Sequence, residues 1–548
     1  MKYLKYILCL TLLAGTFSSC EQFLVETLDH KVSAGTYYTT EDGLEDAVKA
    51  CYTSLKDYWA IEMGATLNCF GTDEYTNGAD GGHKGINFYD SQLNSQESYF
   101  RNSWRNLYRA VNQCNAVVGR ATEIEGIDEA LRNERVAEAR FLRALYYFTL
   151  VRMYGDIHFS LDETQGVETT ANKTPRLDIM NQGIIPDLEF AVDNLPTERG
   201  SAEYGRAHKA AAEFLLAKVV LTRGWWTDTQ SDFTRAQGLM DNVIDNYNFA
   251  LLDNWGDIWD HDAELHSEVV FSIQNIQDPI LNGGNGNRMH LYFLMEYDVL
   301  AGMTRDIENG RPWKRFRPTN WLLNLWNDTP GSDPQPIGSR ADVRYEQGFK
   351  HVFLSNNPST GAAGMMLGDT AVFLPGVEVT DEFRNSKNYL IFSPSEYSDR
   401  RFPTLAKFLD NKRADRQQTQ GSRDWMLMRL ADAYLIAAEA AFKAGDTDAA
   451  AAYINVVRER AGREGRKGEM TITAADVDLD YILDERAREL AGEMHRWFDL
   501  TRTGTLVERV RLHNSTASPN IQDHHVLRPI PQDQIDKVDG GYAQNPGY

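Results

Sequence analysis

Aromatic and amide side chains gather in one glycine-rich stretch, residues 71–90, which reads GTDEYTNGADGGHKGINFYD. Flat rings pack against the apolar faces of sugar rings, while amide and carboxylate groups bond to sugar hydroxyls. Glycine-rich loops can seldom bury large rings, so we expect the rings of this stretch to be exposed. The pattern predicts a sugar-binding platform to which this stretch contributes Asp73, Tyr75, Asn77, Phe88 and Tyr89.

A second concentration of large rings lies further along the chain. Five of the 11 tryptophans fall within residues 255–326. A single tryptophan is weak evidence of a site, because most tryptophans are largely buried. Tyr292 and Trp313 lie outside apolar runs and join the predicted platform. Trp321 and Trp326 belong to the apolar run WLLNLW and are favoured less.

Motifs for catalysis, metal binding or cofactor binding are missing from the sequence. There is no phosphate-binding GxxxxGK[ST] loop, no HExxH and no GxSxG. His261 and His266 are five residues apart, a spacing that does not place both on one helix face. GGNGN at 283–287 lacks the third glycine of a dinucleotide-binding loop. The sequence therefore predicts no catalytic residue, no metal site and no cofactor.

The segment from 485 to 504 is dense in charge and reads ERARELAGEMHRWFDLTRTG. Glu485 and Arg488 are three residues apart, as are Arg486 and Glu489. This spacing suits ion pairs on the surface of one helix. We therefore assign the segment to structural ion pairing rather than to catalysis.

The amino terminus has the pattern of a lipoprotein signal peptide. Lys2 and Lys5 precede an apolar stretch over residues 7–17, too short to span a bilayer. Two serines follow and then Cys20, so cleavage after residue 19 would leave a cysteine whose thiol and amine can carry acyl chains such as palmitate. Each buried methylene contributes ~0.8 kcal/mol, so two or three chains anchor a protein stably. The alternative is plain secretion with cleavage elsewhere.

The formal charge of −23 argues against nucleic acid and anionic membrane surfaces as direct partners, since both attract basic patches. Loss of its two lysines with the signal peptide would take the charge from −23 to −25. Cys51, Cys69 and Cys114 form no metal-binding or paired pattern. They are predicted to be small buried side chains.

Apolar residues recur three and four positions apart in several paired segments. In residues 425–444, WMLMRLADAYLIAAEAAFKA, the pattern stops at Gly445-Asp446 and a second helical pattern follows directly. Alanines at the crossing would let the two helices approach closely, as in tetratricopeptide units. An opening helix is predicted over 42–59, and three further pairs over 103–124 with 134–155, 207–224 with 232–246, and 479–490 with 492–504.

Residues 256–420 hold ten of the 17 prolines. Proline at this density interrupts helices, so loops, short helices and a few strands are predicted there. The chain is accordingly divided into a signal peptide (1–19), a lipidated tether (20–40), an N-terminal helical scaffold part (41–255), a loop-rich ligand-binding insertion (256–420), and a C-terminal helical scaffold part with its tail (421–548).

Several pieces of the sequence, in this order, resemble the SusD/RagB family of nutrient-binding outer-membrane lipoproteins. The combination is specific, although no single piece is, and it covers nearly the whole chain. The pieces are Cys20 with Phe23-Leu24, RFLRALYYFTLVRMYGDI (140–157), RPWKRFRPTNWLLNLW (311–326), RLADAYLIAAEAAFKAGD (429–446), YINVVRERAG (453–462), ILDERARELAGEMHRWFDLTRTG (482–504) and LRPIPQDQI…QNPGY (527–548).

The resemblance implies a mostly α-helical fold, in which about four tetratricopeptide-like helix pairs form a scaffold that holds a large, irregular, loop-rich binding region. It also implies display at the cell surface on the outer membrane through a lipid anchor, with a lid-like role over a SusC-like TonB-dependent transporter. The family offers no catalytic residues to carry over. Its ligand residues vary with substrate, so the predicted platform depends on the loop argument alone.

The sequence thus predicts a non-catalytic protein that captures oligosaccharide or polysaccharide and delivers it to the transporter. Two alternatives remain open. A surface-anchored helical glycoside hydrolase would need two carboxylates about 5–9.5 Å apart in one cleft, and the 79 acidic residues leave room for such a pair. A tetratricopeptide assembly scaffold would bind only protein.

Overall fold

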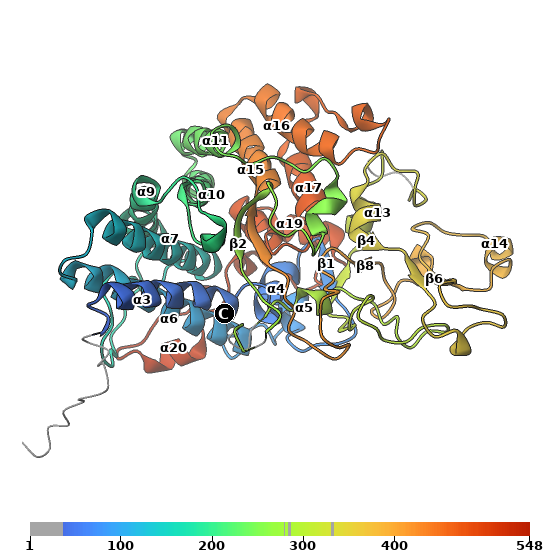
Figure 1. The fold of residues 1–548 in the computed structure, drawn as a ribbon, viewed down its shortest axis with the longest axis horizontal. Coiled ribbons are helices and arrows are strands. Elements are labelled where there is room, and N and C mark those ends of the chain that lie inside the picture. Colours follow the sequence, from blue (N-terminus) through green and yellow to red (C-terminus); the bar gives the residue numbers. More distant parts are fainter. Residues whose placement is uncertain (1–36, 279, 283–285, 330–333) are drawn as a thin grey trace, which may run out of the picture.

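The computed structural model describes residues 37–278, 280–282, 286–329 and 334–548. The predicted signal peptide, Cys20 and the tether as far as residue 36 therefore lie outside the described residues. The described chain is mostly helical, and its strands are short. Figure 1 shows the long helices on one side of the molecule and the loop-rich region on the other.

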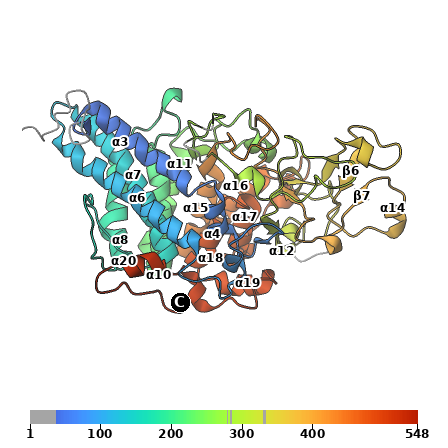
Figure 2. The ribbon, with the colours of Figure 1, turned by 90° about the horizontal axis from the view of Figure 1, so that it is seen from below.

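The scaffold consists of helices that pack one on the next, most of them long (Figures 1 and 2). Each helix in the series α6, α7, α9, α10, α11, α15 and α16 packs on the next one. Helix α3 lies against both α6 and α7. This stack confirms the predicted tetratricopeptide-like scaffold. The helices are α3 (Glu41–Thr53), α6 (Ser98–Arg120), α7 (Glu129–Tyr154), α9 (Ile185–Asn194), α10 (Lys209–Thr227), α11 (Gln230–Asp245), α15 (Leu430–Ala444) and α16 (Thr447–Arg460).

The turn between α15 and α16 shows why these helices end where the pattern predicts. Gly445 takes a left-handed conformation, φ 89°, which glycine adopts at little cost. Asp446 then caps α16, because its carboxylate accepts a hydrogen bond of 2.9 Å from the Ala449 backbone N–H. Small buried side chains such as Ala441 and Ala450 let the two helices approach closely.

Two of the predicted helical segments differ in the structure. Residues 425–429 form a strand, β9 (Trp425–Arg429), antiparallel to β2 (Val269–Ile273), and not the first turn of α15. Apolar spacing over so few residues fits a strand or a helix, and hydrogen bonding to β2 decides between them. The last predicted pair forms α17 (Leu479–Leu490) and α18 (Arg496–Arg502), which pack chiefly on other elements, whereas α9 adds a scaffold helix that the sequence pattern missed.

Residues 256–420 contain loops and short elements, and strands tie them to the rest of the chain. β1 (Tyr75–Asn77) pairs with β3, β2 pairs with β9, β4 pairs with β8, and β5, β6 and β7 form one sheet. The pairs β1–β3 and β2–β9 connect this region to the amino-terminal and carboxyl-terminal parts respectively. Its further elements are β3 (Phe316–Pro318), α12 (Asn320–Asn324), α13 (Arg344–Gly348), β4 (Phe349–Lys350), β5 (Val352–Leu354), β6 (Thr370–Phe373), α14 (Asp381–Asn385), β7 (Leu390–Ile391) and β8 (Thr404–Leu405).

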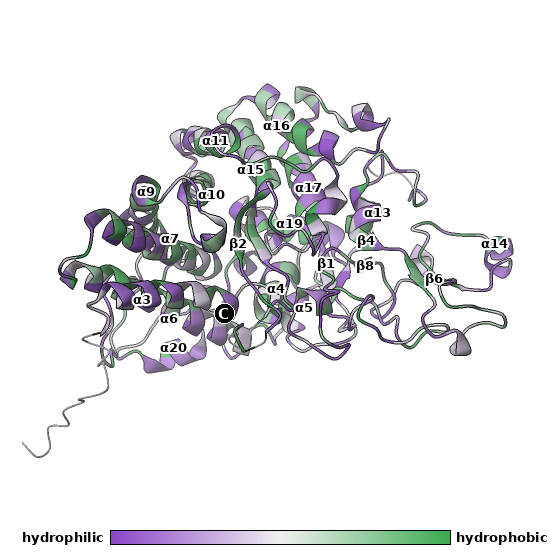
Figure 3. Ribbon diagram, viewed as in Figure 1, coloured by the Kyte–Doolittle hydropathy of each residue, from purple (hydrophilic) through white to green (hydrophobic). Residues whose placement is uncertain are grey.

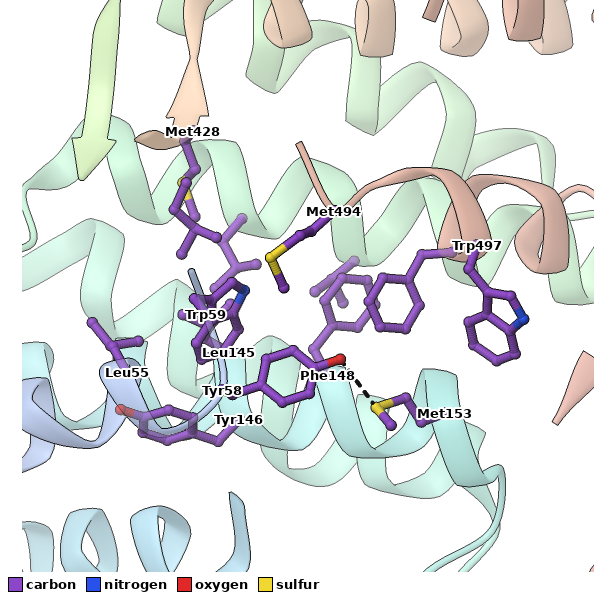
Figure 4. Packing of buried hydrophobic residues seen from close by; sticks show 14 of the residues in the cluster. Leu55, Tyr58, Trp59, Leu145, Tyr146, Phe148, Met153, Met428, Met494 and Trp497 are labelled. Carbon is purple, nitrogen blue, oxygen red and sulfur yellow. Dashed lines mark hydrogen bonds between the residues drawn. The ribbon is translucent and has the colours of Figure 1, made fainter. Parts of the chain in front are cut away.

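The core joins segments that are far apart in the sequence (Figure 4). Tyr58 and Trp59 pack against Phe148 of α7, and Trp497 of α18 lies in the same buried cluster. The Tyr58 hydroxyl donates to Met153 Sδ at 3.3 Å. Figure 3 shows hydrophilic and hydrophobic residues sharing the scaffold helices, as expected of helices with one buried face. Shorter helices complete the described fold: α4 (Glu62–Cys69), α5 (Gly85–Phe88), α8 (Arg176–Ile179), α19 (Leu506–His513) and α20 (Gln532–Lys537).

The three cysteines of the described residues behave as predicted. Cys51 lies in α3, Cys69 in α4 and Cys114 in α6. All three are buried and none forms a disulfide. They fill core positions as small apolar side chains do.

The charged residues of α17 form a buried ion-pair cluster. Glu485 pairs with Arg488 at 2.9 Å, as predicted, and also with Arg344 at 2.8 Å. Glu489 pairs with Arg344 at 2.9 Å, whereas the predicted pair of Glu489 with Arg486 is wrong, because Arg486 turns to partners on other elements. Burial raises the pKa of Glu485, but the surrounding guanidinium groups outweigh burial and lower it to about 2. The cluster therefore holds the loop-rich region against α17.

Candidate functional site

A cleft of about 680 Å³ opens where the loop-rich region meets the carboxyl-terminal part of the chain. Its walls come from β1, β3, α12, the turn at 394–402 and the end of α19 with the segment after it. The lining combines aromatic, hydroxyl, amide and guanidinium groups. The lining residues are Thr76, Arg317, Pro318, Thr319, Asn320, Trp321, Pro394, Ser395, Tyr397, Phe402, Arg511, Leu512, His513, Asn514, Ser515, Ser518 and Pro519.

Strand alternation explains how β1 and β3 present side chains to this cleft. The two strands pair antiparallel, with Thr76 opposite Arg317. Phe316 packs into the core, its ring 4.6 Å from that of Phe70 between centroids. Successive side chains of a strand point to opposite faces, so Arg317 points away from the core and into the cleft.

Trp321 and His513 form a stacked pair in the cleft. Their ring centroids are 4.8 Å apart, and their planes differ by 25°. Thr319 caps α12 by accepting a hydrogen bond of 3.2 Å from the Leu322 N–H, which fixes Trp321 in the first turn of that helix. Burial lowers the pKa of His513, so its imidazole is neutral at neutral pH. Trp321 stays partly exposed and offers ring surface to a ligand.

Asp73 lies behind Trp321 and fixes two arginines there. Its carboxylate accepts from Arg496 at 2.6 Å and from Arg509 at 2.7 Å. These guanidinium groups lie 5.5 and 5.0 Å from the Trp321 ring centroid. Burial raises the pKa of Asp73, but the two guanidinium groups outweigh burial and hold it well below its usual value. Asp73 thus supports the aromatic wall from behind instead of meeting a ligand.

Amide and hydroxyl groups fix the segment that follows α19. Asn514 Nδ2 donates to the Thr72 carbonyl at 2.7 Å. Asn87 Nδ2 donates to Asn77 Oδ1 at 3.1 Å and to Thr516 Oγ1 at 3.2 Å. These bonds tie the segment to β1 and to the glycine-rich stretch, so the two walls of the cleft are held in fixed positions.

Four residues of the predicted platform are buried, which corrects the prediction for them. Asp73, Tyr75 and Tyr292 are 0% exposed, and Tyr89 is 3% exposed. Gly71, at φ 65°, lies so close to Tyr89 that a Cβ there would come within 2.6 Å of its ring. Glycine therefore makes room for the ring to fold over the backbone, the opposite of the exposure that we expected from a glycine-rich stretch.

The other three platform residues are partly exposed. Asn77, Phe88 and Trp313 keep accessible surface, but none of them lines the cleft. The Trp313 ring lies 5.9 Å from the Tyr292 ring and 5.0 Å from the Arg315 guanidinium. A role for these three in ligand binding stays a prediction.

Trp321, which the sequence analysis favoured less than the platform aromatics, lines the cleft. Trp321 and Trp326 were treated alike, but Trp321 belongs to α12 (Asn320–Asn324), whereas Trp326 lies beyond the end of that helix. Trp326 is in the core, 2% exposed, with its ring 5.6 Å from that of Phe349. The polar residues Arg317 and Asn320 just before Trp321 were the available signal that this tryptophan lies near the surface.

The cleft is equipped for binding. Its groups offer a ring face for packing and several hydrogen-bond donors and acceptors. None of the lining residues described is Asp or Glu, so this cleft does not present the carboxylate pair of a glycoside hydrolase. Within the described ranges, no three potential metal-binding side chains come together. No helix in the described part of the chain is long and apolar enough to cross a membrane.

Comparison with protein families gives two matches that together span most of the chain. A family model described as "SusD family" matches residues 267–548. A second model, described as "Starch-binding associating with outer membrane", matches residues 39–221. Among curated proteins, the SusD-like protein P25 of Formosa agariphila is 26% identical over 98% of this chain and 97% of its own.

Solved structures share the fold. A SusD homologue from Bacteroides thetaiotaomicron superposes with a TM-score of 0.74 at 19% identity, covering 94% of this chain and 98% of its own. Surface glycan-binding protein A from the same organism, solved in complex with laminarihexaose, superposes with a TM-score of 0.67 at 19% identity. That match covers 92% of this chain and 99% of the other.

Proposed function

This chain belongs to the SusD family of glycan-binding proteins, and from that membership we propose that it captures an oligosaccharide or polysaccharide at the cell surface. In this proposal it is not an enzyme, and it delivers the captured glycan to a SusC-like TonB-dependent transporter of the outer membrane. The glycan binds in the cleft, and the helical scaffold docks the transporter.

One observation carries the glycan-binding part of the proposal. The stacked pair of Trp321 and His513 stands at a cleft whose other lining groups are hydroxyls, amides and guanidinium groups. A sugar ring packs its apolar face on an aromatic ring, while its hydroxyls form hydrogen bonds with hydroxyl, amide and guanidinium groups. A shallow contact of this kind supports affinities of about 4–8 kcal/mol, in the micromolar to millimolar range.

The fixed geometry of the cleft supports binding without catalysis. Asp73 and Glu74, the two acids behind the aromatic wall, are both buried and do not line the cleft, and Asp73 is also paired with Arg496 and Arg509. Hydrolysis of a glycosidic bond needs one carboxyl group with a raised pKa facing a second carboxylate across the substrate. Release of reducing ends from a broad glycan panel would contradict this part of the proposal.

The membrane anchor in this proposal is a lipid on Cys20, after removal of a signal peptide over residues 1–19. Residues 20–40 then act as a tether, and the body above it comprises parts 41–255, 256–420 and 421–548. The support for this arrangement is the basic, apolar and small-residue pattern of the amino terminus.

The test of glycan binding is retention of purified protein in polysaccharide affinity gels. Replacing Trp321 with Ala removes the ring face, and a tryptophan at the centre of a contact costs about 2 kcal/mol or more when truncated, roughly thirtyfold in affinity. Trp226→Ala is the matched control, since Trp226 is a partly exposed tryptophan on α10, in the scaffold. Equal retention of both variants and the unchanged protein would refute the cleft as the glycan site.

A further inference from the structure

The cleft carries charge of one sign only. Its titratable side chains are Arg317, Arg511 and His513, besides the Tyr397 phenol, and none of the lining residues described is acidic. The chain as a whole has 79 acidic and only 56 basic residues. A strongly acidic protein therefore has no carboxylate among the described residues that line the cleft with the stacked aromatic pair.

Arg317 is the basic group most available to a ligand. In the described part of the chain its guanidinium makes no hydrogen bond and no ion pair, although the charge of the exposed Asp399 acts on it. The two basic residues nearby on the same segment already have carboxylate partners, since Lys314 pairs with Glu296 at 2.8 Å and Arg315 pairs with Glu62 at 2.9 Å. Arg317 is not the only described arginine without a carboxylate partner, since Arg176 and Arg311 also lack one, but neither of these two lines the cleft.

Arg511 adds a second set of donors across the cleft. It is exposed, and its guanidinium makes one bond, to the Ile521 carbonyl at 3.3 Å. A guanidinium group has five N–H donors in a planar fork that matches the two oxygens of a carboxylate or sulfate. The basic groups behind Trp321 do not add to this charge, because Arg496 and Arg509 pair with Asp73 and Arg509 pairs also with two further acids, Asp480 and Asp484.

We propose that the glycan bound in this cleft is acidic, bearing carboxylate or sulfate groups. One anionic group pairs with Arg317, while the face of a neighbouring sugar ring lies on Trp321. This inference rests on the proposed glycan-binding function and narrows it to a substrate class. A neutral glycan would offer the Arg317 guanidinium only hydroxyl partners. Hydrogen bonds from a guanidinium to a hydroxyl are weaker than those to a charged carboxylate or sulfate.

The experiment uses affinity gels cast with matched pairs of polysaccharides. One arm compares polygalacturonate and alginate with their carboxyl-reduced forms, and a second arm compares sulfated glycans with their desulfated forms. We expect retention by at least one acidic glycan and a loss of about tenfold to a hundredfold in affinity for its neutral counterpart, the range for a hydrogen bond to a charged group. The two arms distinguish a carboxylate from a sulfate ligand.

Substitutions at Arg317 test whether the preference for acidic glycans arises in the cleft. Arg317→Gln is expected to lose the acidic preference and Arg317→Lys to keep part of it. Both should fold normally, because the Arg317 guanidinium makes no hydrogen bond or ion pair within the described residues. Arg105→Gln, which changes an exposed arginine on α6, is the matched control and should bind as the unchanged protein does. Binding to the acidic form should also weaken as salt rises, since the contact is ionic.

The outcomes separate this inference from the proposed function. Retention by neutral glycans with no gain for their acidic counterparts would overturn the acidic ligand and leave glycan binding intact. An acidic preference that Arg317→Gln does not reduce would overturn the assignment to this cleft. Failure to bind any glycan in either arm would overturn the proposed function itself, and the acidic inference with it.

Discussion

Asp73 and Glu74 are adjacent, buried acids whose carboxyl groups meet opposite environments. Asp73 is paired with two guanidinium groups, which hold its pKa well below the usual range. Glu74 lies 3.7 Å from Arg496, but that guanidinium is committed to Asp73. Burial therefore dominates at Glu74 and raises its pKa to about 8. One residue of the pair is ionised at neutral pH and the other is protonated.

The two neighbours should respond oppositely to loss of charge. Asp73→Asn leaves Arg496 and Arg509 without their shared carboxylate, and breaking such a buried pair costs about 3–5 kcal/mol of unfolding free energy. Glu74→Gln replaces a group that is already neutral. Because the folded pKa of Glu74 is raised, its stabilising protonation is complete below its ordinary pKa near 4.5 and is lost as pH rises toward 8.

Chemical denaturation at pH 5 and at pH 8.5 measures this difference. Glu74→Gln should gain stability relative to the unchanged protein at the higher pH, on the order of 1 kcal/mol for each pH unit between the two pKa values. A constant difference between the two proteins across this range would show that Glu74 is ionised in the fold.

At the scale of single residues, the sequence predicted the kind of chemistry better than its position. Aromatic and amide groups do line a cleft, but its rings include Trp321 and Tyr397, whereas Tyr75, Tyr89 and Tyr292 are buried elsewhere. Whether a ring is exposed depends on tertiary packing, as at Gly71, where the missing side chain lets Tyr89 fold inward. The composition of a short segment therefore does not predict whether its rings are buried.

Among the elements, the scaffold helices were predictable because long amphipathic segments and their stop signals are local properties. Gly445 and Asp446 mark the α15–α16 turn in the sequence and occupy it in the structure. The strand β9 was not predictable in the same way, since its five residues fit a helical period and become a strand only by pairing with β2, about 150 positions earlier. Short segments with distant partners are where sequence periodicity fails.

The cap of α16 offers a test at this scale. Asp446→Ala removes the side-chain acceptor for the Ala449 N–H and should lower the unfolding free energy by about 1 kcal/mol. Asp448→Ala is the matched control, because Asp448 is an exposed acid of the same helix turn that does not cap. Thermal and denaturant unfolding measure the loss of unfolding free energy in each of the two variants. Equal losses from the two changes would mean that charge near the helix start, not the cap, stabilises α16.

For the whole molecule, the proposal combines a folded body with a lipid attachment. The body binds glycan in a cleft between the loop-rich region and the carboxyl-terminal part, and the lipid on Cys20 provides the attachment to the outer membrane. Cys20→Ala should move the protein from the membrane fraction to the soluble fraction and reduce co-purification of a β-barrel transporter from native outer membranes. Cys9→Ala, which changes the other cysteine of the amino terminus, should leave both properties unchanged. Tight membrane association of the Cys20→Ala protein would contradict the anchor.

The central claim is that a glycan binds on Trp321 in the cleft. Its most direct test is a crystal structure of the protein with an oligosaccharide cut from whichever polysaccharide retains it in affinity gels. The account predicts a sugar ring packed on the indole of Trp321, with polar contacts to residues that line the cleft, Arg317 among them. A sugar bound instead around Trp313 and Phe88, with the cleft empty, would contradict the account.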